Sequence, residues 1–236
     1  QRLNSSISHD SQPSLQQQPE SVQAPLVEGK YPYGFPPSLS HDLFGKSIRS
    51  VTLDKDKKWV ALTFDLCERE NEVAGYDRAV VNQLIENQVK ATFYAGGKWM
   101  QSHPQETKEL MTNSLFELGN HTWSHGNLAV LHGEEMQQQV LKTQRIYDEF
   151  RDELAAQNYH PIPEMRTVRF PYGRCNSKSL EFLRQQQLLA IQWDVVTADP
   201  SPKQTAKGII NIVKKQVKPG SIIIAHANGR GHGTAG

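Results

Sequence analysis

The feature of this sequence that most constrains its fold is a regular alternation of short apolar runs with longer segments of helical periodicity. The run at 59–65 is rich in β-branched and aromatic residues, as strands are, and 76–88 has apolar side chains at helical spacing. Further strands are predicted at 90–95, 115–118, 166–170, 188–193 and 221–225, and further helices at 104–112, 134–156, 177–186 and 203–217. This alternation favours a parallel sheet. Six or more such units favour a (β/α) barrel, whose active sites lie at the C-terminal ends of the strands.

The N-terminal part of the chain differs in composition from the rest. Residues 1–30 are rich in Gln, Ser and Pro and lack periodicity, which predicts a disordered tether. We expect one domain over 31–236, beginning with a proline-rich lead-in up to residue 58 that has a short strand near 50–53. A tether of this kind before a globular domain favours an exported protein, periplasmic or secreted, although no signal is visible in this chain.

Composition excludes several classes of function. The net charge is +1, from 26 basic and 25 acidic residues, so the basic excess typical of nucleic-acid binding is absent. No apolar run approaches the roughly 18 residues of a membrane-spanning helix. Neither a G-x-G-x-x-G nor a G-x-x-x-x-G-K-[ST] motif is present, which disfavours nucleotide binding. The sequence does not indicate the oligomeric state.

Polar side chains with catalytic chemistry follow five of the predicted strands. They are Asp65, the pair His121 and His125, Arg169, Asp199, and His226. Each has an ordinary explanation alone, such as a helix cap, a surface ion pair or a core histidine. Because strand ends converge in a barrel, however, five such positions favour one shared pocket.

The two histidines stand four residues apart in Gly-Asn-His-Thr-Trp-Ser-His. If this segment turns helically, their side chains lie on one face and can meet one metal ion. Neutral imidazole is the commonest protein ligand for zinc and similar divalent metals. The spacing therefore makes His121 and His125 candidate metal ligands.

The five stretches resemble, in order and spacing, the motifs of the polysaccharide deacetylases, the family with the NodB homology domain (carbohydrate esterase family 4). His-Thr-Trp-Ser-His at 121–125 and Arg-Phe-Pro-Tyr-Gly at 169–173 are the closest matches, and the resemblance runs from Trp59 to His226. It implies a distorted (β/α) barrel of about seven parallel strands. It also implies metal-dependent removal of N- or O-linked acetyl groups from a carbohydrate polymer, such as peptidoglycan or a chitin-like glycan.

The resemblance also implies roles for the residues around the metal. His121 and His125 would bind one divalent ion, zinc first, with cobalt, nickel or manganese as alternatives. Asp65 would be the base that activates water. Arg169 would keep Asp65 ionised, because a neighbouring cation favours a charged carboxylate.

Three further roles concern the transition state and the leaving group. The backbone N–H of Tyr172 would help to stabilise the oxyanion. His226 would protonate the leaving amine or alkoxide, and Asp199 would orient the imidazole of His226 and raise its basicity.

The first motif departs from the family pattern Thr-Phe-Asp-Asp-Gly, in which the second Asp is a metal ligand. That position is Leu66 here, which cannot ligate. We expect Glu68 to replace it, because it is the first carboxylate after Asp65 and has a longer side chain. Asp77, Asp65 itself and a Cys67 thiolate remain alternatives.

Two departures concern the later motifs. The fourth motif has Asp199-Pro200 where the family has Asp-Trp, so an aromatic wall is expected from Trp99 or Trp193. The chain also stops soon after His226, where the family adds a helix and a strand, which predicts a barrel truncated at its C-terminal end.

Three alternatives stay open at this point. Cys67 and Cys175, each near one motif, form either a disulfide across the pocket rim or two free thiols. An amidase of the same fold would act on a small cyclic amide in a closed pocket. A non-catalytic sugar-binding relative would have lost its metal with the ligand at position 66.

Overall fold

The computed structural model describes residues 41–159 and 161–236, so the predicted tether and residues 31–40 of the lead-in lie outside the described residues. In the part described, eight strands form one sheet in the order β1-β6-β5-β4-β3-β2-β8-β7, and all neighbouring strands are parallel. The strands are β1 (Ser47–Ile48), β2 (Ala61–Leu66), β3 (Ala91–Ala95), β4 (Phe116–Asn120), β5 (Thr167–Val168), β6 (Leu189–Ile191), β7 (Val195–Val196) and β8 (Ile222–His226).

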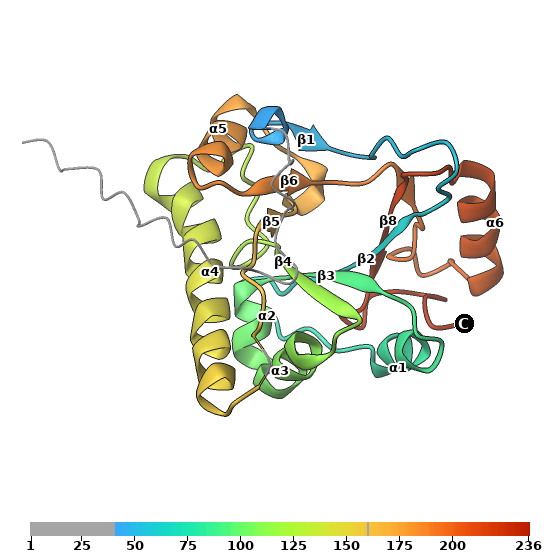
Figure 1. Ribbon diagram of the computed structural model, residues 1–236, viewed down its shortest axis with the longest axis horizontal. Coiled ribbons are helices and arrows are strands. Elements are labelled where there is room, and N and C mark those ends of the chain that lie inside the picture. The colour runs from blue at the N-terminus through green and yellow to red at the C-terminus, as the bar shows by residue number, and fades with distance from the viewer. Residues whose placement is uncertain (1–40, 160) are drawn as a thin grey trace, which may run out of the picture. The chain divides into compact units, whose positions relative to one another are not determined.

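The sheet curls, and the segment after β1 links its two ends. β1 pairs with β6 at one end of the strand order, and Ser50 then forms an antiparallel bridge with Ser221, which directly precedes β8 near the other end. The Val51 N–H donates to the Gly220 carbonyl over 2.9 Å. A Cβ on Gly220 would lie 1.8 Å from the Val51 oxygen, so this approach requires glycine. The distorted (β/α) barrel is confirmed, with eight strands instead of about seven (Figure 1).

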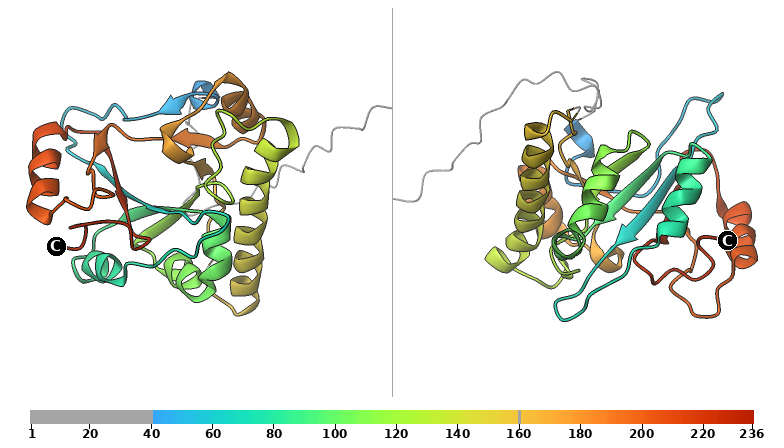
Figure 2. Two further views of the ribbon diagram at one scale, coloured as in Figure 1. Left: turned by 180° about the vertical axis from the view of Figure 1, so that it is seen from behind. Right: turned by 90° about the horizontal axis from the view of Figure 1, so that it is seen from below.

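The helices lie outside the strands, as Figures 1 and 2 show. They are α1 (Arg78–Glu86), α2 (Gly97–Ser102), α3 (Pro104–Thr112), α4 (Gly133–Ala156), α5 (Ser177–Gln185) and α6 (Ala206–Gln216), with 3₁₀ turns at His41–Leu43 and Pro171–Gly173. Within the described ranges, no helix combines the length and the apolar character that a membrane span needs.

The core forms where apolar faces of helices meet the strands. Phe64 of β2 and Phe93 of β3 stack at 5.4 Å between ring centroids, in one cluster with the fully buried Leu66. One face of α4 packs against the strands, because Val140, Tyr147 and Leu154 are buried and Phe150 is partly buried.

Three local predictions were wrong. The strand predicted at 166–170 shortens to β5, because Pro171 lacks an N–H and begins a turn. β7 was not predicted, because its two valines follow β6 too closely to be separated by pattern. The short strand predicted near 50–53 is β1 at Ser47–Ile48 instead, because of 50–53 only Ser50 finds a bridge partner. The predicted C-terminal truncation stays a prediction.

Candidate active site

The five predicted positions meet at the C-terminal ends of the strands. Asp65 and His226 are register partners on the adjacent strands β2 and β8. His121 follows β4 directly, Arg169 follows β5 directly, and Asp199 lies shortly after β7. Since β4, β3, β2 and β8 are neighbours in the sheet, parallel strand ends bring these side chains to one edge.

A buried ion pair between Asp65 and Arg169 forms the base of the site. The Arg169 Nη1 lies 2.9 Å from the Asp65 Oδ1, and both side chains are almost fully buried. The guanidinium also donates to the carbonyls of Ile191 and Gln192, and it lies 4.0 Å from the Tyr94 ring. Burial alone would raise the pKa of Asp65, but His121 and the guanidinium of Arg169, which also donates a hydrogen bond, hold that pKa below its usual range.

The segment with the two histidines is a loop, not a helical turn, which corrects the geometry predicted for it. Thr122 and His125 have left-handed φ angles of 66° and 60°. The loop N–H groups bind side chains instead of carbonyls four residues back: Thr122 N–H donates to the Asn120 amide oxygen, and Ser124 N–H donates to the amide oxygen of Gln139 on α4. The i, i+4 spacing therefore brings the imidazoles together by a different route, with ring centroids 5.0 Å apart.

Each histidine presents one buried nitrogen that lacks a hydrogen-bond partner among the described residues: Nε2 of His121 and Nδ1 of His125. His121 Nδ1 lies 2.9 Å from the Arg169 carbonyl. Because a carbonyl only accepts, Nδ1 carries the proton and Nε2 keeps the lone pair. His121 Nε2 is also 3.3 Å from the Asp65 Oδ2, without the geometry of a hydrogen bond.

Burial keeps both imidazoles neutral. It lowers the pKa of His121, although the Asp65 charge opposes this effect. It also lowers the pKa of His125 to about 3, and the proximity of the His121 imidazole adds to the effect. Neutral imidazoles with inward lone pairs are the form that metals bind. The two nitrogens without partners therefore fit a divalent cation.

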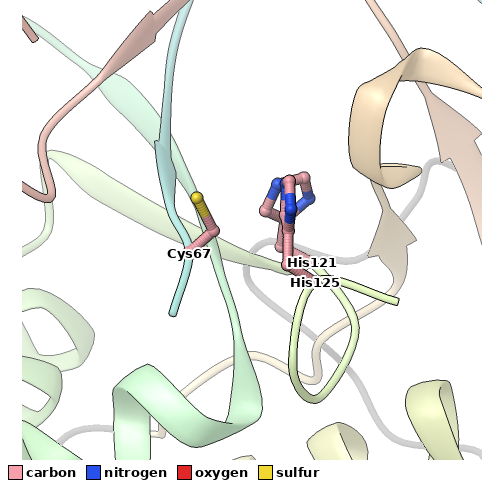
Figure 3. Close-up of side chains that lie close together, drawn as sticks. All are labelled: Cys67, His121 and His125. Atoms are coloured by element: carbon pink, nitrogen blue, oxygen red, sulfur yellow. The ribbon is translucent and has the colours of Figure 1, made fainter. Parts of the chain in front are cut away.

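The third potential ligand beside the imidazoles is Cys67. Its Sγ, His121 and His125 form the one group of three His, Cys, Asp or Glu residues, among those described, whose ligand atoms all lie within 4.8 Å of one another. Figure 3 shows the thiol at the end of β2 and the imidazoles at the end of β4 and in the following loop. Cys67 and Cys175 are both free thiols, so the predicted alternative of a disulfide is not formed.

The structure does not bring Glu68 to the imidazoles. Its buried carboxylate accepts hydrogen bonds from the Ala74 N–H at 3.0 Å and the Ser102 hydroxyl at 2.8 Å, with the Lys98 Nζ at 3.7 Å. These donors hold the carboxylate outside the group formed with the two histidines and compensate its burial. Asp77, the more distant alternative, is the N-cap residue of α1 and also lies outside the group.

Asp199 and His226 form a hydrogen-bonded pair at the other side of the site. The His226 Nδ1–H donates to the Asp199 Oδ1 over 2.9 Å, and the His226 backbone N–H donates to Oδ2 over 2.7 Å. Thr197 and Thr234 hydroxyls also donate to this carboxylate. Burial by itself lowers the pKa of His226, but the hydrogen bond to Asp199 and the charges of Asp65 and Asp199 outweigh it, so the pKa is raised.

Aromatic residues border the histidine loop. Tyr172 has a left-handed φ of 59° in the turn after Arg169, and its half-exposed ring lies 4.5 Å from the His125 ring. The Trp193 indole covers Gly173 so closely that a Cβ there would lie 2.9 Å from it. Trp99 is fully buried, with its Nε1–H on the Gly75 carbonyl. Of the two tryptophans considered for the aromatic wall, Trp193 is the one the structure places at the site.

Sequence reasoning missed several supporting residues. Tyr94 lies under the Arg169 guanidinium, and Asn228 donates from Nδ2 to the Cys67 Sγ over 3.2 Å. Asn228 carried a weak signal, because it lies two residues after His226 and extended chains repeat side-chain direction every second residue. Gln139, which holds the histidine loop, gave no signal in the sequence, because a polar residue on a long helix is usually solvated.

The fold and these side chains define a (β/α)-barrel protein with the residue set of a hydrolytic centre. Residues 52–191, more than half of the chain, match the model of the polysaccharide deacetylase family. The chain belongs to that family.

Relatives with assigned names agree with this placement. The chain is 31% identical over 177 residues to a peptidoglycan-N-acetylglucosamine deacetylase of Bacillus cereus, a match that covers 75% of this chain and 58% of that protein. It is 30% identical over 167 residues to a chitooligosaccharide deacetylase of Sinorhizobium fredii, covering 71% of each. It thus spans less than two thirds of the length of the Bacillus cereus relative.

Solved structures share the fold. One is a peptidoglycan N-acetylglucosamine deacetylase at 27% identity and a TM-score of 0.67, with 82% of this chain and 83% of that chain covered. Another is the peptidoglycan deacetylase PdaC of Bacillus subtilis at 26% identity and a TM-score of 0.60, covering 78% and 82%.

Proposed function

We propose that this chain is a metal-dependent hydrolase that removes N- or O-linked acetyl groups from a carbohydrate polymer such as peptidoglycan or a chitin-like glycan. The observation that carries the proposal is the pair of buried imidazole nitrogens without partners, set between the Asp65–Arg169 ion pair and the Asp199–His226 pair. The names of the relatives support the substrate class.

His121 and His125 would hold one divalent ion, with zinc as the first choice and cobalt, nickel or manganese as alternatives. When bound, such an ion polarises an acetyl carbonyl and lowers the pKa of a water molecule. Asp65 lies beside His121, and Arg169 keeps its carboxylate charged. Asp65 is therefore suited to accept the proton of the attacking water.

His226 has the opposite role. Its raised pKa keeps the imidazole protonated to higher pH than an ordinary histidine, so it can donate a proton to the leaving amine nitrogen or alkoxide oxygen. The Asp199 carboxylate stabilises that imidazolium and fixes the proton on Nδ1. The Tyr172 N–H, in a turn with a left-handed φ, is the proposed oxyanion donor.

Export belongs to the same proposal. Peptidoglycan lies outside the cytoplasmic membrane, so a hydrolase acting on it works in the periplasm or beyond the cell. The half-exposed Tyr172 and Val196 near the strand ends favour an open groove for a polymer over a closed pocket for a small cyclic amide.

Acetate release from peptidoglycan and from chitooligosaccharides, measured with and without a chelator, tests the proposal. We expect release that stops with the chelator and returns with added zinc, and that is lost in His125→Ala but kept in His132→Ala, whose histidine is exposed. Release that ignores the chelator would refute metal dependence. Polymer binding without bound metal and without acetate release would support the non-catalytic sugar-binding alternative instead.

A further inference from the structure

The position that supplies a carboxylate ligand in the family contributes nothing to the metal site here. Leu66 is fully buried in the apolar core, and its carbonyl accepts the Gly96 N–H at 2.9 Å. Two imidazoles alone would leave the site one protein ligand short, because catalytic zinc sites usually have about three protein ligands and one open position. A third ligand must come from another residue.

Cys67 stands where such a ligand is needed. Along an extended chain, alternate side chains share a face, so Cys67 points to the side of Asp65 while Leu66 points into the core. With Zn–N near 2.0–2.1 Å and Zn–S near 2.3 Å, tetrahedral ligand atoms lie roughly 3.5 Å apart. The Cys67 Sγ and the imidazole nitrogens lie within 4.8 Å of one another, so a shift of about an ångström closes the site.

The nearby carboxylates are already bound by other groups. Glu68 is held by Ala74, Ser102 and Lys98, and Asp65 is paired with Arg169. Neither belongs to a group of ligand atoms with both histidines in the described part of the chain. A thiolate would also conserve charge, because one Cys and two neutral His carry the same −1 as one Asp and two neutral His.

Asn228 is built to hold that sulfur. Its buried amide Nδ2 donates to the Cys67 carbonyl over 2.8 Å and to the Cys67 Sγ over 3.2 Å. Both contacts fix the cysteine backbone and side chain together, while burial raises the pKa of the Cys67 thiol to about 12 in the metal-free protein. A hydrogen bond of this kind is the usual support behind a metal ligand.

Resting on the proposed metal dependence, we propose that Cys67 is the third protein ligand, so that a thiolate replaces the family's carboxylate in a Cys-His-His site. Asn228 is its positioning residue. Because a thiolate is a softer donor than a carboxylate, this site selects zinc and cobalt over magnesium and manganese more strongly than a carboxylate site does.

Cobalt(II) added to the metal-free full chain tests the ligand directly, because a thiolate bound to cobalt gives a charge-transfer absorption in the near ultraviolet. We expect this band in the wild-type protein, in Glu68→Gln and in Cys175→Ser, but not in Cys67→Ser. Zinc should bind Cys67→Ser at least about tenfold more weakly, a loss of about 1.4 kcal/mol. Thermal unfolding of the metal-free variants controls for misfolding.

The outcomes separate this inference from the function beneath it. Cobalt binding by the wild-type protein without the band, with equal zinc affinity in Cys67→Ser, would overturn the thiolate ligand and leave the metal-dependent function standing. Failure of the wild-type protein to bind either metal would overturn the metal site itself. In Asn228→Ala the band should move to lower energy, because the sulfur loses its hydrogen bond; an unmoved band would refute the positioning role.

Discussion

Removing the guanidinium while keeping the carboxylate should make Arg169→Met one of the most destabilising substitutions in the chain. The two side chains are 0% and 4% exposed and 2.9 Å apart, so solvent screens the pair very little. Without Arg169, Asp65 is a buried charge with its main partner gone. Breaking a buried pair in this way costs about 3–5 kcal/mol.

The sign of the pH dependence follows from the same pair. In the wild-type protein the pKa of Asp65 is lowered, so its contribution to stability is present above the unfolded value of about 3.9 and is lost as pH falls through the folded value. In Arg169→Met, burial dominates and raises that pKa. The carboxyl group then takes up a proton on folding, and the variant loses stability as pH rises from the unfolded pKa through the raised folded pKa.

Urea unfolding at several pH values, with chelator present to remove any linkage to metal binding, measures these effects. The double variant Asp65→Asn, Arg169→Met removes both charges and should be more stable than Arg169→Met alone. A loss below about 1 kcal/mol in Arg169→Met, or a double variant less stable than the single one, would refute the assignment of a buried ion pair.

Three further predictions concern the reacting groups. Asp65→Asn should lower kcat by about 10²–10⁴ while zinc content stays unchanged; loss of zinc would place Asp65 among the ligands. Because the pKa of His226 is raised by its bond to Asp199, kcat/KM should fall as pH rises through that pKa, and in Asp199→Asn the fall should begin at lower pH; an unmoved limb in the pH profile would exclude His226 as the acid. His125→Ala should lose bound zinc, measured by elemental analysis, whereas His132→Ala should keep it; equal metal content in both would place the ion elsewhere.

The sequence predicted which strand ends carry the site residues, because the positions of the strands depend on patterns of burial. Apolar runs such as 59–65 and 221–225 end in polar residues, and parallel topology alone brings those ends together. The pairing of Asp65 with Arg169 and of Asp199 with His226 agrees with the roles inferred from the motifs. The roles themselves stay predictions.

The features of the site that the sequence did not predict depend on which hydrogen-bond donor each polar group meets in the folded chain. Glu68 looked free to ligate, but the Ala74 N–H, the Ser102 hydroxyl and the Lys98 ammonium come from segments whose approach no local pattern encodes. The histidine loop looked helical because a spacing of four cannot distinguish a helical turn from a loop held by Gln139.

The link between Ser50 and Ser221 also sets an order of events in folding. The bridge joins residues that are almost at opposite ends of the described domain. The pairing of β2 with β8 also joins residues that are far apart in the sequence. Contacts this distant in sequence carry a large loop-closure cost and form slowly. Because β8 follows β2 and β3 by more than a hundred residues in the chain, the register pair of Asp65 with His226 is expected to form late in folding. The side chains of the proposed site are therefore expected to come together among the last steps of folding.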